Sequence, residues 1–497
     1  MDLRPNFELA PIVKLMINIG ALVDIPTGSY LKGKHGEHIL NGGLGILSGV
    51  VGIGNNFKST VADWMLLMAT SRFKGSYLNT YDTEVNIHED HKRKFYQKIF
   101  GFKGEDILKT GRWTITDKTK YTGDEYYDKM KTYQLDKKKF ADKIMITTPF
   151  LDRDGKSLLK VIQPTFRGID SFSEFVTQDV IKMQDDNELG EAGGNTIFMR
   201  QGLQKSRFLM EVPGNATAAY DYVMLTAHIG TEFSMDPRNP PPKKLQHLKG
   251  GQKIKGAPEK FTFSTNNCWH CYNAAPFIDQ GTKGPAYPRS PTDDMVGDTD
   301  LNIVTIRQLR SKSGPSGMAI ELVVSQQEGV LPSLSEFHYI KENERFGLEG
   351  NVQNYVLALC PEIKLSRTTV RGKIDKHPEL RRALNICAEL CQITDLWHHM
   401  DQRLLCTPKQ LYDDLKARGY DWEILLNTRG YWVSQDKEAE EPPFLSTMDL
   451  LLMRAGIYVP YWYSKELLAK VNTKLSPNFV PNEIAVLERQ LDVPAEA

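Results

Sequence analysis

The sequence predicts an α/β fold built around a phosphate-binding loop. The apolar run from Leu44 to Val51 is typical of a buried parallel strand, and the apolar spacing from Val61 to Ser71 is helical. Between them lies Gly52-Ile53-Gly54-Asn55-Asn56-Phe57-Lys58-Ser59-Thr60, which combines glycines, a lysine and a hydroxyl group. A strand, such a loop and a helix in this order are typical of a nucleotide-binding sheet.

The loop departs from the G-x-x-x-x-G-K-[ST] pattern at one position, because Phe57 stands where the last glycine is expected. We therefore expect Phe57 to point away from the nucleotide and an exposed Lys58 to reach the terminal phosphates. The residues expected to bind the nucleotide are Gly52, Gly54, Asn55, Asn56, Phe57, Lys58, Ser59 and Thr60. The Ser59 hydroxyl is an expected Mg²⁺ ligand. The alternative is a strand-to-helix turn with a surface lysine.

The composition excludes several classes of protein. The chain has 497 residues, with 62 basic and 62 acidic side chains, so any DNA-binding surface must be local. Six cysteines are too few for a disulfide framework, and residues 1–30 lack a signal-peptide pattern, which predicts a cytoplasmic protein, in the host cytoplasm if viral. No apolar run approaches the ~20 residues that would span a bilayer, so we expect no membrane insertion.

A second strand is predicted from Ser76 to Glu84, and it ends in two carboxylates, Asp82 and Glu84. The carboxyl ends of parallel strands face the ligand in such sheets. A carboxylate there can polarise the water that attacks a terminal phosphate. The alternative for Asp82 is a capping role at a helix start.

These residues carry a resemblance to a known family. Phe57 before the lysine, followed by Tyr81-Asp82-Thr83-Glu84, resembles the RecA superfamily and is closest to the phage-type (UvsX-like) recombinases. The resemblance implies a RecA-like P-loop ATPase core with a mainly parallel sheet, in which Glu84 activates water. Arg167-Gly168-Ile169-Asp170-Ser171 is similar to the family's next strand, which implies that Asp170 holds Mg²⁺ through water. Because Pro164 precedes it, this strand is expected to start late.

The resemblance extends to two later strands. Tyr222 to His228 is similar to the strand whose terminal residue senses the terminal phosphate, which assigns that role to His228. Ile303 to Arg310 is similar to the strand that carries paired cations, which implies that Arg310 and Lys312 reach the ATP of a neighbouring subunit. The alternatives are a structural histidine and a solvated basic turn.

Two segments correspond to the family's DNA-facing loops. The first lies between Phe172 and Asn195, before a helix predicted from Thr196 to Leu209, and it is acidic. Its acidic residues are Asp179, Asp185, Asp186, Glu188 and Glu191. The second follows His228 and is basic and glycine-rich, as expected for contact with a DNA backbone. Its lysines are Lys243, Lys244, Lys249, Lys253 and Lys255. A solvated linker is the alternative for the second segment.

The domain organisation is predicted in three parts. Residues 1–43 form a short, turn-rich assembly segment, 44–340 the ATPase core, and 341–497 a mostly helical C-terminal domain. Within the core, 101–160 is read as an insertion and 276–300 as a long surface loop. In the C-terminal part, Thr407-Pro408-Lys409-Gln410 predicts a capped helix that Gly419 ends.

The pair Cys268 and Cys271 could hold zinc, but no second C-x-x-C exists to complete four ligands. Cys387 and Cys391 lie on a helical pattern from Leu380 to Ile393 and are expected to be buried.

The functional hypothesis is an ATP- and Mg²⁺-dependent recombinase. It would assemble as a filament on single-stranded DNA, pair that strand with a homologous duplex and meet single-strand-binding or mediator proteins. Two alternatives remain, a ring helicase or helicase loader of the same superfamily and a non-catalytic, nucleotide-dependent scaffold. Only 51 residues precede Gly52, which favours the recombinase over helicases with a sizeable N-terminal domain.

Overall fold

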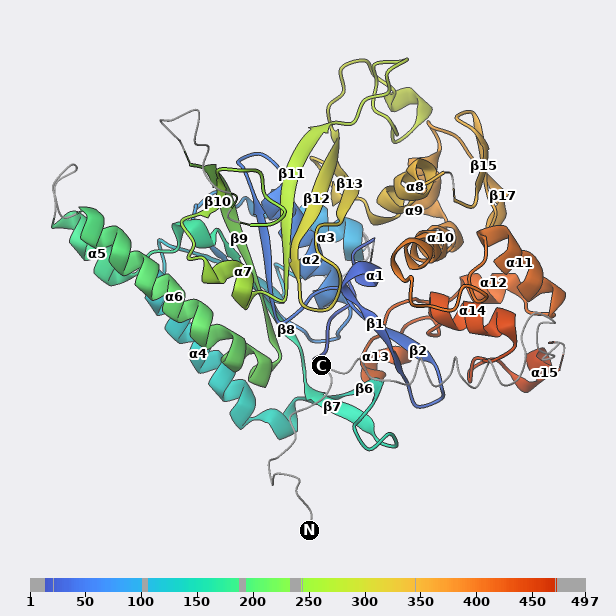
Figure 1. The fold of residues 1–497 in the computed structure, drawn as a ribbon, viewed down its shortest axis with the longest axis horizontal. Coiled ribbons are helices and arrows are strands. Elements are labelled where there is room, and N and C mark those ends of the chain that lie inside the picture. Colours follow the sequence, from blue (N-terminus) through green and yellow to red (C-terminus); the bar gives the residue numbers. More distant parts are fainter. Residues whose placement is uncertain are drawn as a thin grey trace, which may run out of the picture.

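A ten-stranded sheet forms the centre of the computed structural model, which describes residues 14–20, 22–100, 106–186, 194–232, 243, 245–344, 346–469 and 471 (Figure 1). The strands lie in the order β14-β13-β12-β11-β3-β9-β8-β4-β5, and β10 pairs with β9. Their bounds are Leu47–Gly52 (β3), Leu78–Asp82 (β4), Trp113–Asp117 (β5), Thr165–Asp170 (β8), Asp221–Thr231 (β9), Gln252–Lys255 (β10), Asn267–Pro276 (β11), Leu301–Ser311 (β12), Ala319–Ser325 (β13) and Gly329–Val330 (β14). The sheet is parallel from β11 to β5 and antiparallel elsewhere. The predicted α/β class with a mainly parallel sheet is confirmed.

The strands predicted from sequence are present, and their register aligns their carboxyl ends. β3 is buried along its whole length between two parallel neighbours, as its apolar run predicted. Gly52 lies opposite His228 on one side and Cys271 on the other, while Asp82 lies opposite Asp170. β8 begins directly after Pro164, as expected. The predicted site residues of four strands therefore meet at one edge of the sheet, which we call the carboxyl edge.

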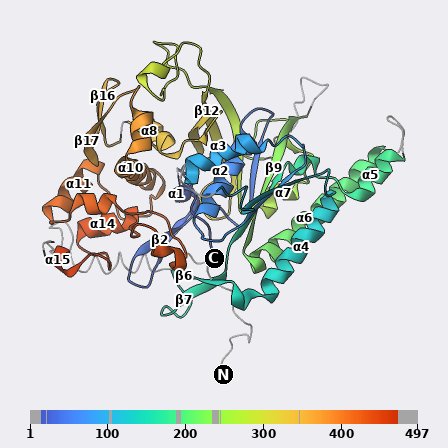
Figure 2. The same cartoon turned by 180° about the vertical axis from the view of Figure 1, so that it is seen from behind.

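Helices cover both faces of the sheet (Figures 1 and 2). One face carries α2 (Lys58–Ser71), α3 (Glu89–Phe100) and α8 (Pro332–Glu342), and the other carries α4 (Gly123–Lys139), α6 (Gly194–Ala219) and α7 (Lys260–Ser264). Successive residues of β9 point to opposite faces of the sheet. Met224 belongs to the hydrophobic core beneath α2, and Leu225 belongs to the core beneath α6. α6 is longer than the predicted helix 196–209, and with α5 (Gln178–Asp185) it extends away from the body.

The segment before β3 contains more regular structure than the turns predicted for it. A short helix, α1 (Asp24–Thr27), precedes a hairpin of β1 (Ser29–Lys32) and β2 (His38–Asn41). The Asp24 carboxylate accepts hydrogen bonds from the backbone N–H groups of Ile19 and Gly20. The hairpin was missed because its strands are only four residues long.

The C-terminal part is mainly helical from residue 370 onward, but it begins with a three-stranded antiparallel sheet that the sequence did not predict. This sheet consists of β15 (Leu348–Asn351), β16 (Asn354–Leu357) and β17 (Cys360–Leu365). The helices that follow are α9 (Val370–Lys376), α10 (Pro378–Leu396), α11 (Pro408–Ala417), α12 (Trp422–Leu426), α13 (Gln435–Glu438), α14 (Thr447–Ala455) and α15 (Lys465–Leu468). The predicted capping box of α11 is confirmed, and α10 buries Cys387 and Cys391 as expected.

The C-terminal part packs directly against the rest of the chain. The ring of Trp432 is buried against Phe73 and Phe150, and its indole N–H donates to the carbonyl of Met16 at 3.2 Å. Gln392 of α10 donates to the carbonyl of Leu22 at 2.9 Å. The division into parts at residues 43 and 340 stays a prediction.

Two segments were read as additions to the core. Within 101–160, β5 joins the edge of the large sheet, α4 packs on α6, and β6 (Met145–Leu151) pairs with β7 (Leu158–Ile162). Residues 277–300 form the expected long surface loop, with one short 3-10 helix (Pro291–Asp293). Among the described helices, none is both long and apolar enough to cross a membrane.

Candidate nucleotide-binding site

The loop between β3 and α2 leaves its backbone open to a ligand. Asn55 and Phe57 have left-handed backbone angles, with φ of 63° and 58°. At Gly54 there is open space where a Cβ atom would stand. Asn56 anchors the loop, since its side-chain amide donates to the carbonyl of Cys271 at 3.1 Å. Because α2 begins at Lys58, the unpaired N–H groups and the positive dipole end of this helix face the loop.

Phe57 occupies a position that favours glycine, because a φ of 58° is unfavourable for a bulky side chain. Its ring is half-buried and packs against the hydrophobic core on the α2 side of the sheet. This agrees with the expectation that the ring turns away from the ligand position. Packing of the ring offsets part of the backbone cost.

Lys58 is buried, contrary to the expectation of an exposed lysine, and only 8% of its surface is accessible. It forms no hydrogen bond or ion pair within the described part of the chain. A buried ammonium group without a partner is costly, so an anion bound here would relieve that cost. The lysine, the open Gly54 backbone and the α2 N-terminus therefore fit a phosphate group.

Asp82 closes the loop that follows β4. Its two carboxylate oxygens accept four hydrogen bonds from the backbone N–H groups of Glu84, Val85, Asn86 and Ile87, at 2.8 to 2.9 Å. Asp82 therefore caps this loop, whereas the alternative expected from sequence was a cap at a helix start, and the next helix, α3, begins only at Glu89. This cap holds Glu84 in a fixed position at the carboxyl edge.

Glu84 and His228 meet at the carboxyl edge, although 143 residues separate them in the chain. The Nε2 of His228 lies 2.9 Å from Oε1 of Glu84, and both side chains are about a quarter exposed, 25% and 26%. Partial burial by itself would raise the pKa of Glu84, but the hydrogen bond from His228 and the charge of Lys58 outweigh it and lower that pKa. Glu84 is thus held as a carboxylate beside the lysine.

Asp170 ends β8 two strands away from β3. Its Oδ1 accepts a hydrogen bond from the hydroxyl of Thr226 on β9 at 2.5 Å, which fixes the carboxylate toward the carboxyl edge. Ser59 lies in the first turn of α2 and is half-buried. Within the described residues, no group of three or more histidine, cysteine, aspartate or glutamate side chains is placed to hold a metal. A serine hydroxyl and one carboxylate suit Mg²⁺, which keeps several waters and takes further oxygens from phosphates.

A buried ion pair close to this site was not predicted from the sequence. Lys92 of α3 pairs with Asp63 of α2, and both side chains are buried. The charges of Asp170 and Asp82 also act on Lys92 and raise its pKa together with Asp63, against the effect of burial. The positive charge of Lys92 therefore partly balances the negative charge of three carboxylates next to the candidate site. An aspartate within the apolar α2 was the one available signal.

The basic segment after His228 is partly a strand rather than a flexible loop. β10 pairs with the end of β9, with Lys255 opposite His228 and Lys253 opposite Gly230. Lys249 and Lys255 are exposed, whereas Lys253 pairs with Glu232 at 2.8 Å. Lys243 is exposed, and Lys244 lies outside the described residues. Three of the predicted DNA-binding lysines are thus carried by, or adjoin, the ribbon that β10 forms with β9.

The first predicted DNA loop is described only in part. Residues 187–193 of this segment, including Glu188 and Glu191, lie outside the described residues. Asp179 and Asp185 lie on α5, and Asp186 caps its end. Asp179 lies 3.7 Å from Arg200 of α6.

Arg310 and Lys312 lie at the opposite edge of the sheet from the loop and Glu84. Arg310 pairs with Cys268 in the β11–β12 register, and Cys268 is level with Gly49, near the start of β3. The Arg310 guanidinium lies 5.4 Å from the ring centre of Phe263, and its Nε is buried with no hydrogen-bond partner among the described residues. Burial and the charge of Arg310 lower the pKa of Lys312. The structure therefore separates these cations from the nucleotide site of their own chain.

Cys268 and Cys271 cannot share one metal ion. Both lie on β11, where an odd spacing sends their side chains to opposite faces of the sheet, and they belong to different hydrophobic cores. Burial raises the pKa of each thiol to about 12. They are structural core residues.

Comparisons with known proteins add little to this geometry. No protein-family model matches the chain, and no curated protein matches it significantly. Among solved structures, the chain is similar to one described as the RadB recombinase, with 12% sequence identity and a TM-score of 0.31, over 58% of this chain and 90% of the other. A similarity of this size is too weak to carry an argument about function, which therefore depends on the residues themselves.

Proposed function

We propose that this protein is a Mg²⁺- and ATP-dependent ATPase of RecA type that acts on DNA as a recombinase. The observation that carries the proposal is the contact between Glu84 and His228, at 2.9 Å, beside Lys58, which has no hydrogen-bond or ion-pair partner within the described part of the chain. These residues follow three parallel strands and supply a carboxylate, a sensor and a phosphate-binding lysine. Such a set is the minimum required to hydrolyse a nucleoside triphosphate and to detect its terminal phosphate. The sequence resemblance to RecA-type ATPases supports the same assignment.

Each residue has a role that follows from its position. Lys58 and the N-terminus of α2 bind the terminal phosphates, and Ser59 with Asp170 would hold Mg²⁺, which neutralises phosphate charge when bound. Glu84 orients and polarises the attacking water, a task that its lowered pKa suits because it stays ionised. His228 shares its hydrogen-bonding capacity between Glu84 and the terminal phosphate. Loss of that phosphate would leave Glu84 as its partner.

The DNA-binding surface in this proposal is the β9–β10 ribbon. Ser173 joins the ribbon to the sensor, because its hydroxyl donates to the carbonyl of Lys255 and accepts from the backbone N–H of His228. A shift of His228 would therefore be transmitted to the lysines through two hydrogen bonds. We propose that single-stranded DNA contacts Lys249 and Lys255 first, since both are exposed and neither forms an ion pair with another residue that the structure describes.

The proposed assembly of several copies follows from the position of Arg310 and Lys312, which lie away from the nucleotide site of their own chain. Arg310 and Lys312 cannot contact their own nucleotide, so we propose that they complete the site of a neighbouring copy. Arg310→Ala is expected to lose about 1,000-fold or more in ATP hydrolysis, the scale of an arginine acting in trans. Mixing Arg310→Ala with Lys58→Ala protein should restore hydrolysis. At some interfaces the intact Lys58 of the first variant would then face the intact Arg310 of the second, which completes one site. No recovery at any ratio, with co-assembly verified, would count against action in trans.

Electron microscopy with single-stranded DNA and a slowly hydrolysed ATP analogue tests the recombinase assignment. We expect helical filaments, and joint molecules when homologous duplex is added. Closed rings that unwind a forked substrate without forming joint molecules would replace the recombinase by a helicase. Nucleotide-dependent DNA binding without any hydrolysis would identify a scaffold.

A further inference from the structure

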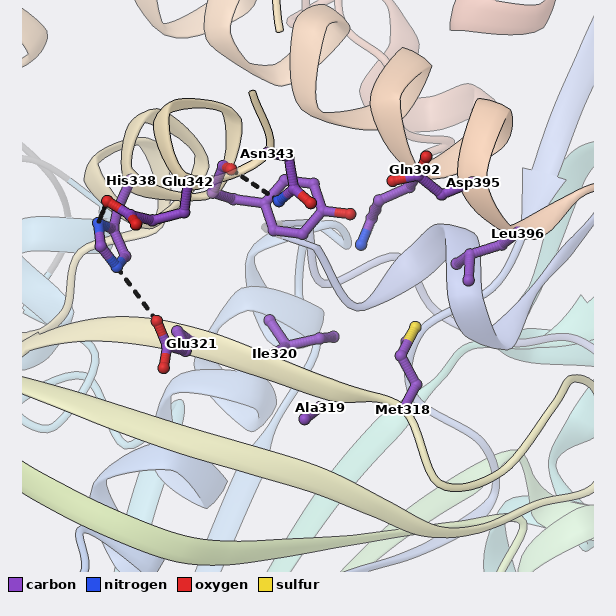
Figure 3. A pocket seen from close by; sticks show the side chains of 11 residues that line it. Met318, Ala319, Ile320, Glu321, His338, Glu342, Asn343, Gln392, Asp395 and Leu396 are labelled. Atoms are coloured by element: carbon purple, nitrogen blue, oxygen red, sulfur yellow. Dashed lines mark hydrogen bonds and ion pairs between the residues drawn. The ribbon is translucent and has the colours of Figure 1, made fainter. Parts of the chain in front are cut away.

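Lys205 of α6 is a buried lysine that faces no carboxylate. Other buried bases of this protein do face one. Lys92 pairs with Asp63. His338 pairs with Glu321 beside a cavity between β13, α8 and α10 (Figure 3). Lys205 is 2% exposed, and no carboxylate within the described part of the chain lies close enough to pair with its ammonium group.

The Lys205 ammonium group instead bonds two backbone carbonyls from different segments. Its Nζ donates to the carbonyl of Ser173 at 2.7 Å and to that of Gly256 at 2.7 Å. Ser173 belongs to a short 3-10 helix (Phe172–Glu174) that follows β8, and Gly256 directly follows β10. Burial lowers the pKa of Lys205 to about 8, and the charge of Glu174 opposes this effect. Burying an ammonium group without a carboxylate is costly, which points to a specific use for these two hydrogen bonds.

Both acceptors belong to the connection between the β9–β10 ribbon and the sensor. The Ser173 hydroxyl donates to the last carbonyl of β10 and accepts from the backbone N–H of His228. Gly256 packs so closely on this turn that a Cβ atom there would lie 2.8 Å from the carbonyl oxygen of Ser173. His228 in turn contacts Glu84. Lys205 thus links α6 to the ribbon and, through Ser173, to the sensor.

The helix that carries Lys205 follows the first segment expected to face DNA. α6 spans 26 residues (Gly194–Ala219), and with α5 it extends away from the body (Figure 1). The second segment expected to face DNA includes the β10 strand of the ribbon. One buried side chain therefore holds together the two segments that DNA would contact and the turn that positions the sensor.

We propose that Lys205 is a positioning residue that couples DNA binding to ATP hydrolysis. It clamps the end of β10 and the turn at Ser173 onto α6, so that a displacement of the ribbon by DNA moves the backbone at His228. That movement changes the contact between His228 and Glu84. The coupling rests on the proposed function, whereas the clamp itself is a property of the fold. ATP binding and DNA binding then favour each other by an equal factor, because coupling between two binding sites is reciprocal.

Lys205→Met tests this role, because it removes the ammonium group and keeps an unbranched side chain. Basal ATP hydrolysis should stay close to that of the natural protein, since no residue at the nucleotide site is changed. The stimulation of hydrolysis by single-stranded DNA should fall about tenfold, a typical size for coupling between two sites. In hydrogen-exchange measurements without nucleotide or DNA, the backbone amides of β10 should exchange at least about tenfold faster, because two charge-assisted hydrogen bonds are lost.

Lys137→Met is the matched control. Lys137 of α4 is 6% exposed and also donates to backbone carbonyls, those of Gln163 and Tyr220. Burial lowers its pKa to about 8 as well. These carbonyls precede β8 and β9, at the opposite edge of the sheet from the sensor. The control should lower the melting temperature to a similar extent as Lys205→Met and leave both DNA stimulation and the exchange of β10 unchanged.

Gly256→Ala is a second test that keeps the lysine. Gly256 is exposed and has a φ of 65°, so the added Cβ atom pushes the end of the ribbon away from Ser173 without disturbing the core. DNA stimulation should fall as it does in Lys205→Met.

Unchanged DNA stimulation in Lys205→Met would overturn the coupling, and so would an equal loss in Lys137→Met, because the effect would then be general destabilisation. If the natural protein hydrolyses no ATP, the proposed function is wrong. The exchange of β10 in Lys205→Met then still decides the clamp, which faster exchange supports and unchanged exchange overturns.

Discussion

The carboxyl edge of the sheet and the junction between α1, α8 and α10 hold charged residues in opposite ways. At the carboxyl edge, Glu84 and His228 are each about a quarter exposed, and Lys58 has no partner among the described residues. At the junction, Glu336 is buried and Glu389 is half-buried, and the two share one donor, because the side-chain amide of Asn385 donates to both at 3.1 Å. The first group is open to a ligand, while the second is closed by its own hydrogen bonds.

The larger pKa shifts belong to the closed group. Burial raises the pKa of Glu336 to about 8 and that of Asp24 to about 7, whereas Glu84 is shifted downward by a hydrogen bond and a charge. Titratable residues with perturbed pKa values are often functional, but burial alone produces the same perturbation. The comparison shows that access and missing partners identify the site, and that the size of a pKa shift does not.

Between the two groups compared here, the larger effect on hydrolysis is expected at the open group. Glu84→Gln should slow ATP hydrolysis at least ~100-fold, because the amide can still hydrogen-bond but no longer polarises the water. ATP binding should change little, since Lys58 and the loop are intact. Phosphate release and binding of a fluorescent nucleotide measure the two effects. Glu174→Gln, an exposed glutamate on the neighbouring segment, is the control. Turnover close to that of the control would make Glu84 a loop residue without a catalytic role.

Glu336→Gln should do the reverse, changing stability but not hydrolysis. The folded pKa of Glu336 is about 8, above its ordinary value of 4.5. Its stabilising protonated form is therefore fully present below pH ~4.5, and the free energy of unfolding falls as pH rises from there through about 8. The slope cannot exceed about 1.4 kcal/mol per pH unit for one proton. Glutamine is neutral at every pH, so the variant should lose this slope and be more stable than the natural protein at pH 8.

Urea unfolding at pH 5, 6.5 and 8 measures that slope. The exposed Glu344→Gln should keep the pH dependence of the natural protein. Parallel stability curves for Glu336→Gln and the natural protein would contradict the assignment of a raised pKa. A loss of hydrolysis in Glu336→Gln at unchanged stability would contradict the separation of the two groups.

The sequence predicted the open group better than the closed one, for a physical reason. Glu84 and His228 end apolar strands, and the carboxyl ends of parallel strands meet at one edge whatever the rest of the chain does. The junction depends on packing between segments far apart in the chain, such as Asp24 and Asn385, and no local pattern signals it. The same applies to the Asp63 and Lys92 pair. The buried state of Lys58 was missed because a motif fixes residue types and not their depth.

A smaller effect is expected at the β9–β10 ribbon. For single-stranded DNA each phosphate contact contributes about 0.7 to the slope of log affinity against log salt, so Lys249→Gln with Lys255→Gln should flatten it by about 1.4. Lys253→Gln alone should change it less, because Lys253 is already paired with Glu232. Lys138→Gln with Lys139→Gln, on the exposed end of α4, is the charge-matched control. An equal change in the control would mean that the ribbon is not a specific contact surface.

The smallest expected effect concerns the backbone of the open group itself. Phe57 has a φ of 58°, which costs a residue with a Cβ atom roughly 1 kcal/mol that glycine does not incur. Phe57→Gly relieves this cost but loses the packing of the half-buried ring, so its net stability change should be small. Phe57→Ala loses the same ring and keeps the Cβ atom, so it should be about 1 kcal/mol less stable than Phe57→Gly in urea unfolding. Equal stability of the two variants would show that the loop relaxes to an ordinary backbone angle when the ring is removed. Any change in the ATP affinity of Phe57→Gly would then be due to the lost packing of the ring and not to its backbone angle.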